Sequence, residues 1–170
     1  MHARLHRAAE EQVMEKRSVN ESQVHTTQLV LPNDTNQMGN LLGGTLMHWI
    51  DIAAAIAAQR HAGRVCVTAS VDELNFHYPI RLGEIVTLQA SVNRAFRTSM
   101  EVGVIVTAAS LHGGSPRRAT NAYLTFVSLD ESGRPAEVPE VVPQSAEEQR
   151  RYHEALDRRQ HRLQQRQASH

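Results

Sequence analysis

Hydrophobic and polar side chains alternate with a period of two along four stretches in the middle of the chain. These stretches are residues 65–71, 85–92, 100–107 and 122–126, where every second side chain is apolar. Such alternation is typical of strands in a sheet that buries one face. Residues 18–31 also have an extended pattern, and Gly113-Gly114 fits a turn between two strands. The pattern therefore predicts a mainly antiparallel sheet.

A second pattern runs from Thr45 to His61, where apolar residues occupy nearly every face of a helix. A helix of this kind belongs inside a core. Gly63 is placed to end it, and its many alanines would let a curved sheet approach closely. We therefore expect an α+β fold in which the sheet wraps around one long helix.

Two flanking segments differ from this central pattern. Residues 1–17 have a weak apolar stripe and predict a short charged helix. After Gln144, the run Ser145-Ala146-Glu147-Glu148 is a capping box, and an arginine-rich helix follows that is expected to lie on a surface. The expected organisation is an N-terminal extension at 1–17, one domain at 18–133, and a linker with the C-terminal helix at 134–170.

Composition excludes several classes of protein. The 170 residues contain 18 Lys+Arg and 18 Asp+Glu, so no net charge favours nucleic acid or a membrane surface. The single cysteine, Cys66, forms no intramolecular disulfide and suits a reducing compartment. The first residues lack the apolar core of a secretory signal, and the longest apolar stretch is too short to span a bilayer. We expect a cytoplasmic protein with no nucleic-acid or membrane partner.

The predicted central helix carries one carboxylate, Asp51, among apolar neighbours. Burying a carboxylate costs roughly several kcal/mol unless it is paired, hydrogen-bonded or protonated. Gly43 and Gly44 lie where this helix should begin, so their N–H groups and the helix dipole can face an electron-rich ligand atom. A base near a bare helix start suits acyl chemistry. The structural alternative is that Asp51 caps N–H groups of a neighbouring strand.

Metal and thiol chemistry have no support in the sequence. The ten histidines form no HExxH motif and no Cys/His cluster, so no metal is expected. Cys66 lies in a predicted strand with no positioned histidine. It is therefore expected to be a small core or pocket residue and not a nucleophile.

An ordered series of short motifs resembles the hotdog-fold acyl-CoA thioesterases, in particular the cytosolic acyl-CoA hydrolase branch. The resemblance covers roughly Ser18 to Asp130. The motifs are Leu31-Pro32-Asn33-Asp34-Thr35-Asn36, Gly39-Asn40, Gly43-Gly44, Met47, Trp49, Asp51, Arg60-His61, Val67-Thr68-Ala69-Ser70-Val71-Asp72 and Arg97-Thr98-Ser99-Met100-Glu101-Val102.

The resemblance implies a hotdog fold, dimerised by joining two sheets edge to edge, with three dimers in a hexamer. It implies that Asp51 is the general base and that Asn40 acts across the interface with the other subunit's carboxylate. Carbonyl polarisation by backbone N–H falls near Gly43 and Gly44. The substrate is acyl-CoA, so coenzyme A enters as part of the substrate and no separate cofactor is implied.

Several residues are candidates for binding the rest of the substrate. The resemblance suggests that Arg97, Thr98 and Ser99 contact the pantetheine or phosphates of CoA; the alternative is a tight strand connection. Ser70 belongs to another motif of the series and is a further candidate. Three basic residues near the end of the central helix are candidates for contacts with the nucleotide: Arg60, His61 and Arg64. The alternative is that they satisfy the last carbonyls of the helix.

Hydrolysis of acyl-CoA to a free acid and CoA is the function that this sequence favours. Direct attack by Asp51 on the thioester is chemically open as well. Two other functions remain as alternatives. A non-catalytic acyl-CoA-binding module would have no use for a buried base, and a hotdog hydratase would need a catalytic histidine, for which His48 is the one nearby candidate.

Overall fold

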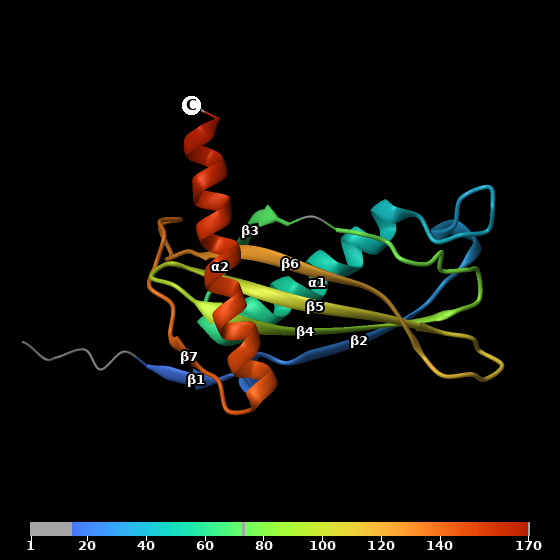
Figure 1. Ribbon diagram of the computed structural model, residues 1–170, viewed down its shortest axis with the longest axis horizontal. Helices are drawn as coiled ribbons and strands as arrows, with labels where there is room; N and C mark the ends of the chain where they lie inside the picture. Colours follow the sequence, from blue (N-terminus) through green and yellow to red (C-terminus); the bar gives the residue numbers. More distant parts are fainter. Residues whose placement is uncertain (1–14, 73, 170) are drawn as a thin grey trace, which may run out of the picture.

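The computed structural model describes residues 15–72 and 74–169, which form a five-stranded antiparallel sheet around one long helix (Figure 1). Each pair of neighbouring strands is antiparallel, as the alternating pattern predicted. The outermost strands are short and the three central ones are long. Across the sheet the order is β2 (Val24–Leu29), β4 (Ile85–Ala95), β5 (Ser99–Ala109), β6 (Arg117–Ser128) and β3 (Cys66–Val71).

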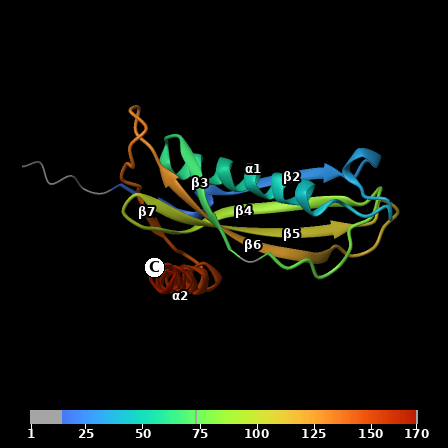
Figure 2. The ribbon, with the colours of Figure 1, turned by 90° about the horizontal axis from the view of Figure 1, so that it is seen from above.

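Helix α1 (Gly43–Ala62) lies along one face of the sheet, and Figure 2 shows the strands curving around it. It begins at the glycine pair, two residues before the predicted start, and ends at Gly63, whose φ of 66° is left-handed. The α+β hotdog prediction is confirmed. Alanines at 53, 54, 57 and 58 have no exposed surface, so small side chains do let the sheet come close. The inner face of the sheet supplies the other side of the core, with Val86, Leu88, Val102, Leu124 and Phe126.

Helix α2 (Ala146–Ala168) crosses the opposite, outer face of the sheet. Its predicted capping box is confirmed, because the Ser145 hydroxyl accepts a hydrogen bond from the N–H of Glu148 at 3.1 Å. The helix is held by a fully buried carboxylate: Glu101 of β5 accepts two hydrogen bonds from Arg158, at 2.7 and 3.0 Å. The predicted surface helix thus covers polar groups of the sheet.

The N-terminal part of the domain differs from the prediction. A 3₁₀ turn (Val19–Ser22) interrupts the expected extended segment at 18–31, because Glu21 accepts hydrogen bonds from the backbone and hydroxyl of Ser18. Residues 1–14 of the predicted N-terminal helix lie outside the described residues. The following β1 (Lys16–Ser18) is a strand, paired in parallel with β7 (Glu140–Val142), a pairing that sequence patterning missed.

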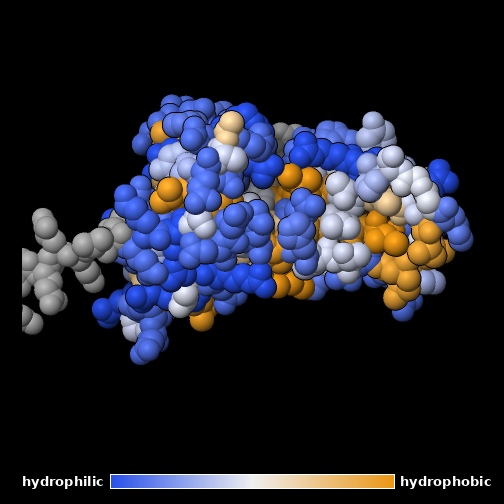
Figure 3. Space-filling model, turned by 90° about the horizontal axis from the view of Figure 1, so that it is seen from below, coloured by the Kyte–Doolittle hydropathy of each residue, from blue (hydrophilic) through white to orange (hydrophobic). Residues whose placement is uncertain are grey.

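Hydrophobic surface gathers at the end of the molecule where α1 begins. Figure 3 shows it at the right-hand end of the view. The exposed apolar side chains of these loops include Leu31, Met38, Leu42, Leu82 and Leu111. No helix in the described part of the chain is both long and apolar enough to cross a membrane.

Candidate functional site

Asp51 lies on the third turn of α1, on the side of the helix that turns away from the sheet interior. The prediction that it is buried is wrong for the single chain, where it is half-buried. The physical reason is that the sheet covers only one side of α1. Its neighbour Ile52 is 44% exposed although it is apolar, so this side of the helix also lacks a cover within one chain.

Thr68 of β3 holds the Asp51 carboxylate. Its hydroxyl donates a hydrogen bond to Oδ1 of Asp51 at 2.7 Å. Because β3 is one of the two edge strands of the sheet, and no other strand of the described residues pairs with its outer side, this carboxylate lies beside a free edge. Sequence reasoning missed the role of Thr68, although this residue is part of the motif series that carried the resemblance.

The start of α1 presents free backbone donors. Leu42 precedes the helix and makes no side-chain cap, so the first N–H groups, from Gly43 onward, remain available. Helix dipole and N–H groups together favour an oxyanion there. However, Asp51 lies eight residues further along, about 12 Å at ~1.5 Å per residue. The base and the helix start of one chain are therefore too far apart to act on the same carbonyl.

The loop before α1 is organised by Asn36. Its side-chain oxygen accepts hydrogen bonds from the N–H groups of Met38 and Asn40, at 2.9 and 3.1 Å. Asn40 pairs with Arg81 through the backbone. Beside this loop lies an apolar pocket of about 290 Å³, which Asn40 and Gly43 line together with Leu41, Leu46, Phe76, Tyr78 and Ile80. Two of the predicted site residues, Asn40 and Gly43, thus line one pocket at the N-terminal end of α1.

The basic group at the C-terminal end of α1 is mostly structural. His61 has no exposed surface, and its Nε2 hydrogen-bonds the carbonyl of Pro139 at 2.8 Å, so its predicted contact with a nucleotide is corrected. Burial lowers the pKa of this imidazole.

The arginines near the same end of α1 differ in their contacts. Arg60 donates to the carbonyl of Gln23 at 2.6 Å. The last helix carbonyls are capped by another residue, Arg17. Of the three predicted residues, Arg64 alone is exposed without such an anchor among the described contacts.

Ser70 lies on the other face of the sheet from Asp51. A bulge between Thr68 and Ser70 shifts the register of β3 against β6. In an unbroken strand the two side chains would share a face, but the extra residue turns them apart. Thr68 meets α1, whereas Ser70 lines a pocket with Asp72 and Arg162 under α2. Ser70 therefore lies apart from Asp51 within one chain, and its predicted contact with the substrate stays a prediction.

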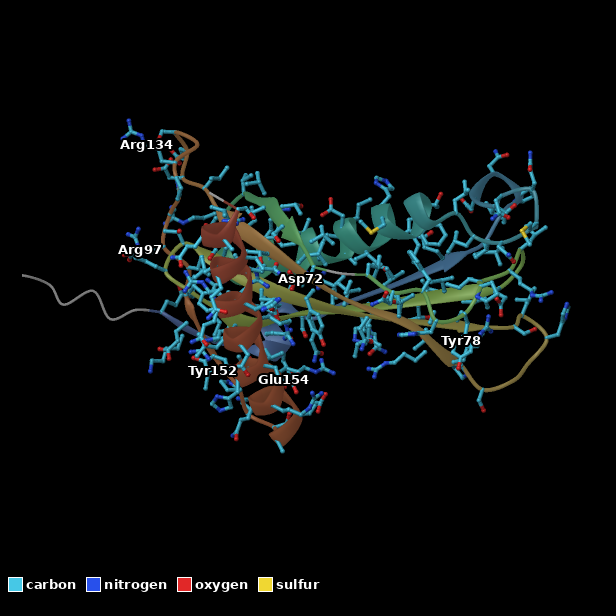
Figure 4. The ribbon with its side chains drawn as sticks, turned by 45° about the horizontal axis from the view of Figure 1, so that its top comes forward. Asp72, Tyr78, Arg97, Arg134, Tyr152 and Glu154 are labelled. Atoms are coloured by element: carbon cyan, nitrogen blue, oxygen red, sulfur yellow. The ribbon has the colours of Figure 1, made fainter. Side chains whose placement is uncertain are left out.

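Arg97 and Thr98 lie in the connection between β4 and β5, and Ser99 is the first residue of β5. The turn is closed by a hydrogen bond from the N–H of Phe96 to the carbonyl of Ser99 at 2.7 Å. Arg97 is exposed, and Figure 4 shows it at the opposite end of the molecule from Tyr78. One chain therefore does not bring Arg97 and the apolar pocket together, and its contact with CoA stays a prediction.

Other chemistries receive little support from the geometry. Burial raises the pKa of the Cys66 thiol to about 11, so it is protonated at neutral pH and unsuited to attack. Within residues 15–72 and 74–169, no three His, Cys, Asp or Glu side chains are grouped to hold a metal ion.

Comparison with known proteins finds one family. Residues 38–114 match the family model of the thioesterase superfamily. A Bacillus subtilis (strain 168) protein named as an uncharacterised acyl-CoA thioester hydrolase, YkhA, is 42% identical over 85% of this chain and 84% of its own length. Mouse acyl-coenzyme A thioesterase 11 is 41% identical over 85% of this chain. The chain spans only 24% of that mouse protein.

Solved structures are similar over nearly the whole chain. An acyl-CoA hydrolase of Staphylococcus aureus, in complex with butyryl-CoA, CoA and CoA disulfide, has a TM-score of 0.86 and 40% identity over 91% of this chain and 94% of its own. The structure of a hexameric acyl-CoA thioesterase also has a TM-score of 0.86 and 40% identity, over 89% of this chain and 97% of its own.

Three further structures of the Staphylococcus aureus enzyme each carry alanine in place of one residue: an aspartate, an asparagine or a threonine. They are 38 to 39% identical to this chain, covering 91 to 92% of it and 93 to 95% of their own, with TM-scores of 0.85 to 0.88. The asparagine precedes the aspartate by 15 residues, and the threonine follows it by 17.

Proposed function

Because the chain belongs to the hotdog-fold acyl-CoA thioesterases of the thioesterase superfamily, we propose that it hydrolyses acyl-CoA to a free carboxylic acid and CoA. The observation that carries this proposal is the Asp51–Thr68 hydrogen bond on the central helix, beside the free edge of the sheet. A chain that served only to bind acyl-CoA would have no use for a carboxylate held ready in this way.

In the proposed reaction, Asp51 accepts a proton from water as the water oxygen bonds to the thioester carbon. The carbonyl oxygen becomes an oxyanion, which backbone N–H groups at the start of a helix stabilise. The carbon–sulfur bond then breaks, the sulfur leaves with the electron pair, and the proton held by Asp51 neutralises it. Thr68 fixes the carboxylate through its hydroxyl. If Asp51 instead attacks directly, an anhydride forms and water cleaves it.

The site is proposed to span two subunits. One chain separates Asp51 from its own helix start by about 12 Å, so the oxyanion donors facing Asp51 would come from a second copy. Asp51 and Thr68 lie at the free β3 edge, where two sheets joined edge to edge would meet. Dimers and a trimer of dimers fit this arrangement, and a hexameric relative supports self-association.

The asparagine of the site has two candidates. The resemblance placed it on Asn40, which lines the pocket at the start of α1. The spacing in the Staphylococcus aureus variants instead fits Asn36, 15 residues before Asp51, just as Thr68 is 17 residues after it. We therefore add Asn36 and Thr68 to the proposed site, with Asn40 kept as the second candidate for orienting water or the thioester.

The acyl chain is proposed to enter the pocket at the start of α1. Its volume of about 290 Å³ and its apolar lining, which includes Phe76 and Leu46, suit an acyl group of limited length. The phosphates of CoA would lie outside this pocket, near exposed basic residues such as Arg64 and Arg97. A cytoplasmic location is part of the same proposal and fits the single reduced cysteine.

The decisive test replaces Asp51 by asparagine, which keeps the shape and removes the charge. Released CoA is measured with a thiol reagent across acyl-CoAs of increasing chain length. We expect kcat to fall by about 10²-fold or more while CoA binding survives. A folded Asp51→Asn protein with full turnover would exclude this role for Asp51. A wild-type protein that binds acyl-CoA without releasing CoA would favour the binding-module alternative.

A further inference from the structure

Helix α2 crosses the sheet strand by strand and leaves it at the β3 edge. Near its start, the carbonyl of Tyr152 accepts a hydrogen bond from Arg94 of β4 at 3.1 Å. Further along, Arg158 donates hydrogen bonds to Glu101 of β5. Its guanidinium carbon also lies 3.7 Å from the centre of the Tyr123 ring of β6. The helix therefore runs across the strands and toward the β3 edge (Figure 1).

The last anchor of α2 is Arg162, which donates to both oxygens of Asp72 at 2.9 and 3.2 Å. Asp72 directly follows β3, the outermost strand. Residues 163–168 extend the helix by about 9 Å, which is nearly twice the ~4.8 Å spacing of strands. In Figure 1 this end of α2 projects past β3. The helix is thus longer than the sheet that it covers.

The face that α2 turns to its sheet continues into this overhang, which we define as residues 163–168. Ala155 of α2 is fully buried, and Arg162, seven residues later, lies on the same face of the helix. By helical spacing, Leu163 and Arg166 extend that face. Leu163 is 44% exposed. Among the described residues, side-chain hydrogen bonds beyond Arg162 stay within the helix, as from Ser169 to the carbonyl of Gln165.

The edge beneath the overhang is open to pairing. β3 (Cys66–Val71) contains no charged residue and no proline, the usual protections of an edge strand. Val67 and Val71 are 43% and 40% exposed, and Val65 just before the strand is 62% exposed. An edge of this kind accepts another strand, and the hexameric relative indicates that a second copy of the chain is the natural source.

We propose that residues 163–168 form a clasp over a second copy of this chain, joined through β3. In an antiparallel pair of β3 strands the twofold axis is perpendicular to the sheet, so both α2 helices lie on one face and run toward each other. Each overhang then crosses the junction and lies over the partner's sheet. Leu163 and Arg166 gain a surface to pack on, and the contact is made twice.

The test compares dimer dissociation constants by analytical ultracentrifugation, without substrate, so the result does not depend on the proposed hydrolysis. One variant ends at Arg162 and retains every anchor of α2 to its own sheet. A second, Leu163→Ser, keeps the full length. The matched control is Gln164→Ser, which lies in the same overhang on the opposite face of the helix. Hydrogen exchange of the β3 amides reports whether that edge is paired.

We expect the shortened chain to dissociate at least about 10-fold more readily than the full chain, Leu163→Ser to weaken the dimer in the same direction, and Gln164→Ser to leave it unchanged. The β3 amides should be protected in the full-length dimer and exchange faster in the shortened chain at equal concentration. Unchanged dissociation in both variants, a monomeric full-length chain, or unprotected β3 amides in the dimer would each overturn the clasp.

Discussion

Asp51 and Thr68 belong to two elements, and their contact is made where the central helix passes the rim of the sheet. The carboxylate is half-buried and accepts one short hydrogen bond, at 2.7 Å, from the Thr68 hydroxyl. A hydrogen bond to a charged acceptor of this kind orients the group as well as stabilising it. The hydroxyl, and not the shape of Thr68, is therefore the feature that matters for the proposed base.

Replacing Thr68 by valine tests this directly, because valine keeps the branched shape that suits a strand and removes the donor. We expect kcat to fall by about 10-fold or more, with a smaller effect on KM. Thr68→Ser retains a hydroxyl and should keep most of the turnover. Equal losses in both variants would assign Thr68 to strand packing instead.

At the scale of elements, the most demanding contact lies between α2 and β5. Glu101 has no exposed surface, and Arg158 and Asn93 both donate to it. A buried charge is tolerated only when its partners are in place, so this ion pair fixes the position of α2 more strictly than apolar packing would. The site on α1 and the arginines of α2 are thereby held on opposite faces of one sheet.

Breaking that contact should be costly. In Glu101→Gln the guanidinium of Arg158 loses its buried countercharge and keeps only the longer contact with Glu154, at 3.7 Å. We expect the free energy of unfolding to fall by about 3 kcal/mol. Urea denaturation at fixed protein concentration measures this. The matched control is Arg150→Gln, which breaks exposed ion pairs with Glu147 and Glu154 on the same helix and should change stability little. Similar losses of stability in the two variants would contradict a special role for the buried Glu101–Arg158 ion pair.

The stability of the fold is expected to depend on pH through His61, near the C-terminal end of α1. Burial lowers the pKa of His61 below its usual value, although the Pro139 carbonyl partly opposes this. The unfolded chain therefore binds more protons than the folded one as pH falls below about 6.5, so acid destabilises the fold through this group.

We expect the free energy of unfolding of the wild-type protein to decrease from pH 7 to pH 5 more steeply than that of His61→Gln. Asp72 has a pKa raised by burial and acts in the opposite direction, but it is present in both proteins. Denaturant midpoints at the two pH values give the comparison. Parallel slopes for the two proteins would show that His61 does not titrate in this range.

At the scale of the whole molecule, the proposed site is incomplete in one subunit. Mixing inactive subunits tests this, because a dimer of Asp51→Ala with an asparagine variant regains one intact site if the two residues come from different chains. We expect partial recovery of turnover when subunits exchange. Running the experiment with Asn36→Ala and with Asn40→Ala identifies which asparagine acts across the interface.

Exchange of subunits is verified by mass spectrometry of differently tagged chains. Recovery with neither asparagine variant, after verified exchange, would mean that each subunit carries a complete site. Each variant must first be shown to lose activity when assembled alone, since an active variant cannot report complementation.

Much of the element pattern could be read from the sequence, because periodicity is a local property. Alternation along β4, β5 and β6 and the apolar run of α1 reflect which face each element buries. The capping box of α2 likewise depends on neighbouring residues only. The parallel pairing of β1 with β7 was missed, since three-residue strands carry too little periodicity to be recognised.

The candidate site was only partly predictable, because its contacts join residues far apart in the chain. Asp51 was found because a carboxylate stands out in an apolar helix. The exposure of that carboxylate, its bond to Thr68 and the burial of His61 depend on how the sheet closes around α1, which no local pattern records. The bulge that turns Ser70 away from Thr68 is equally a property of the paired strands. Sequence alone thus determined the elements and the candidate base, whereas tertiary structure decided which residues meet it, because burial and long-range hydrogen bonds exist only once the sheet has formed.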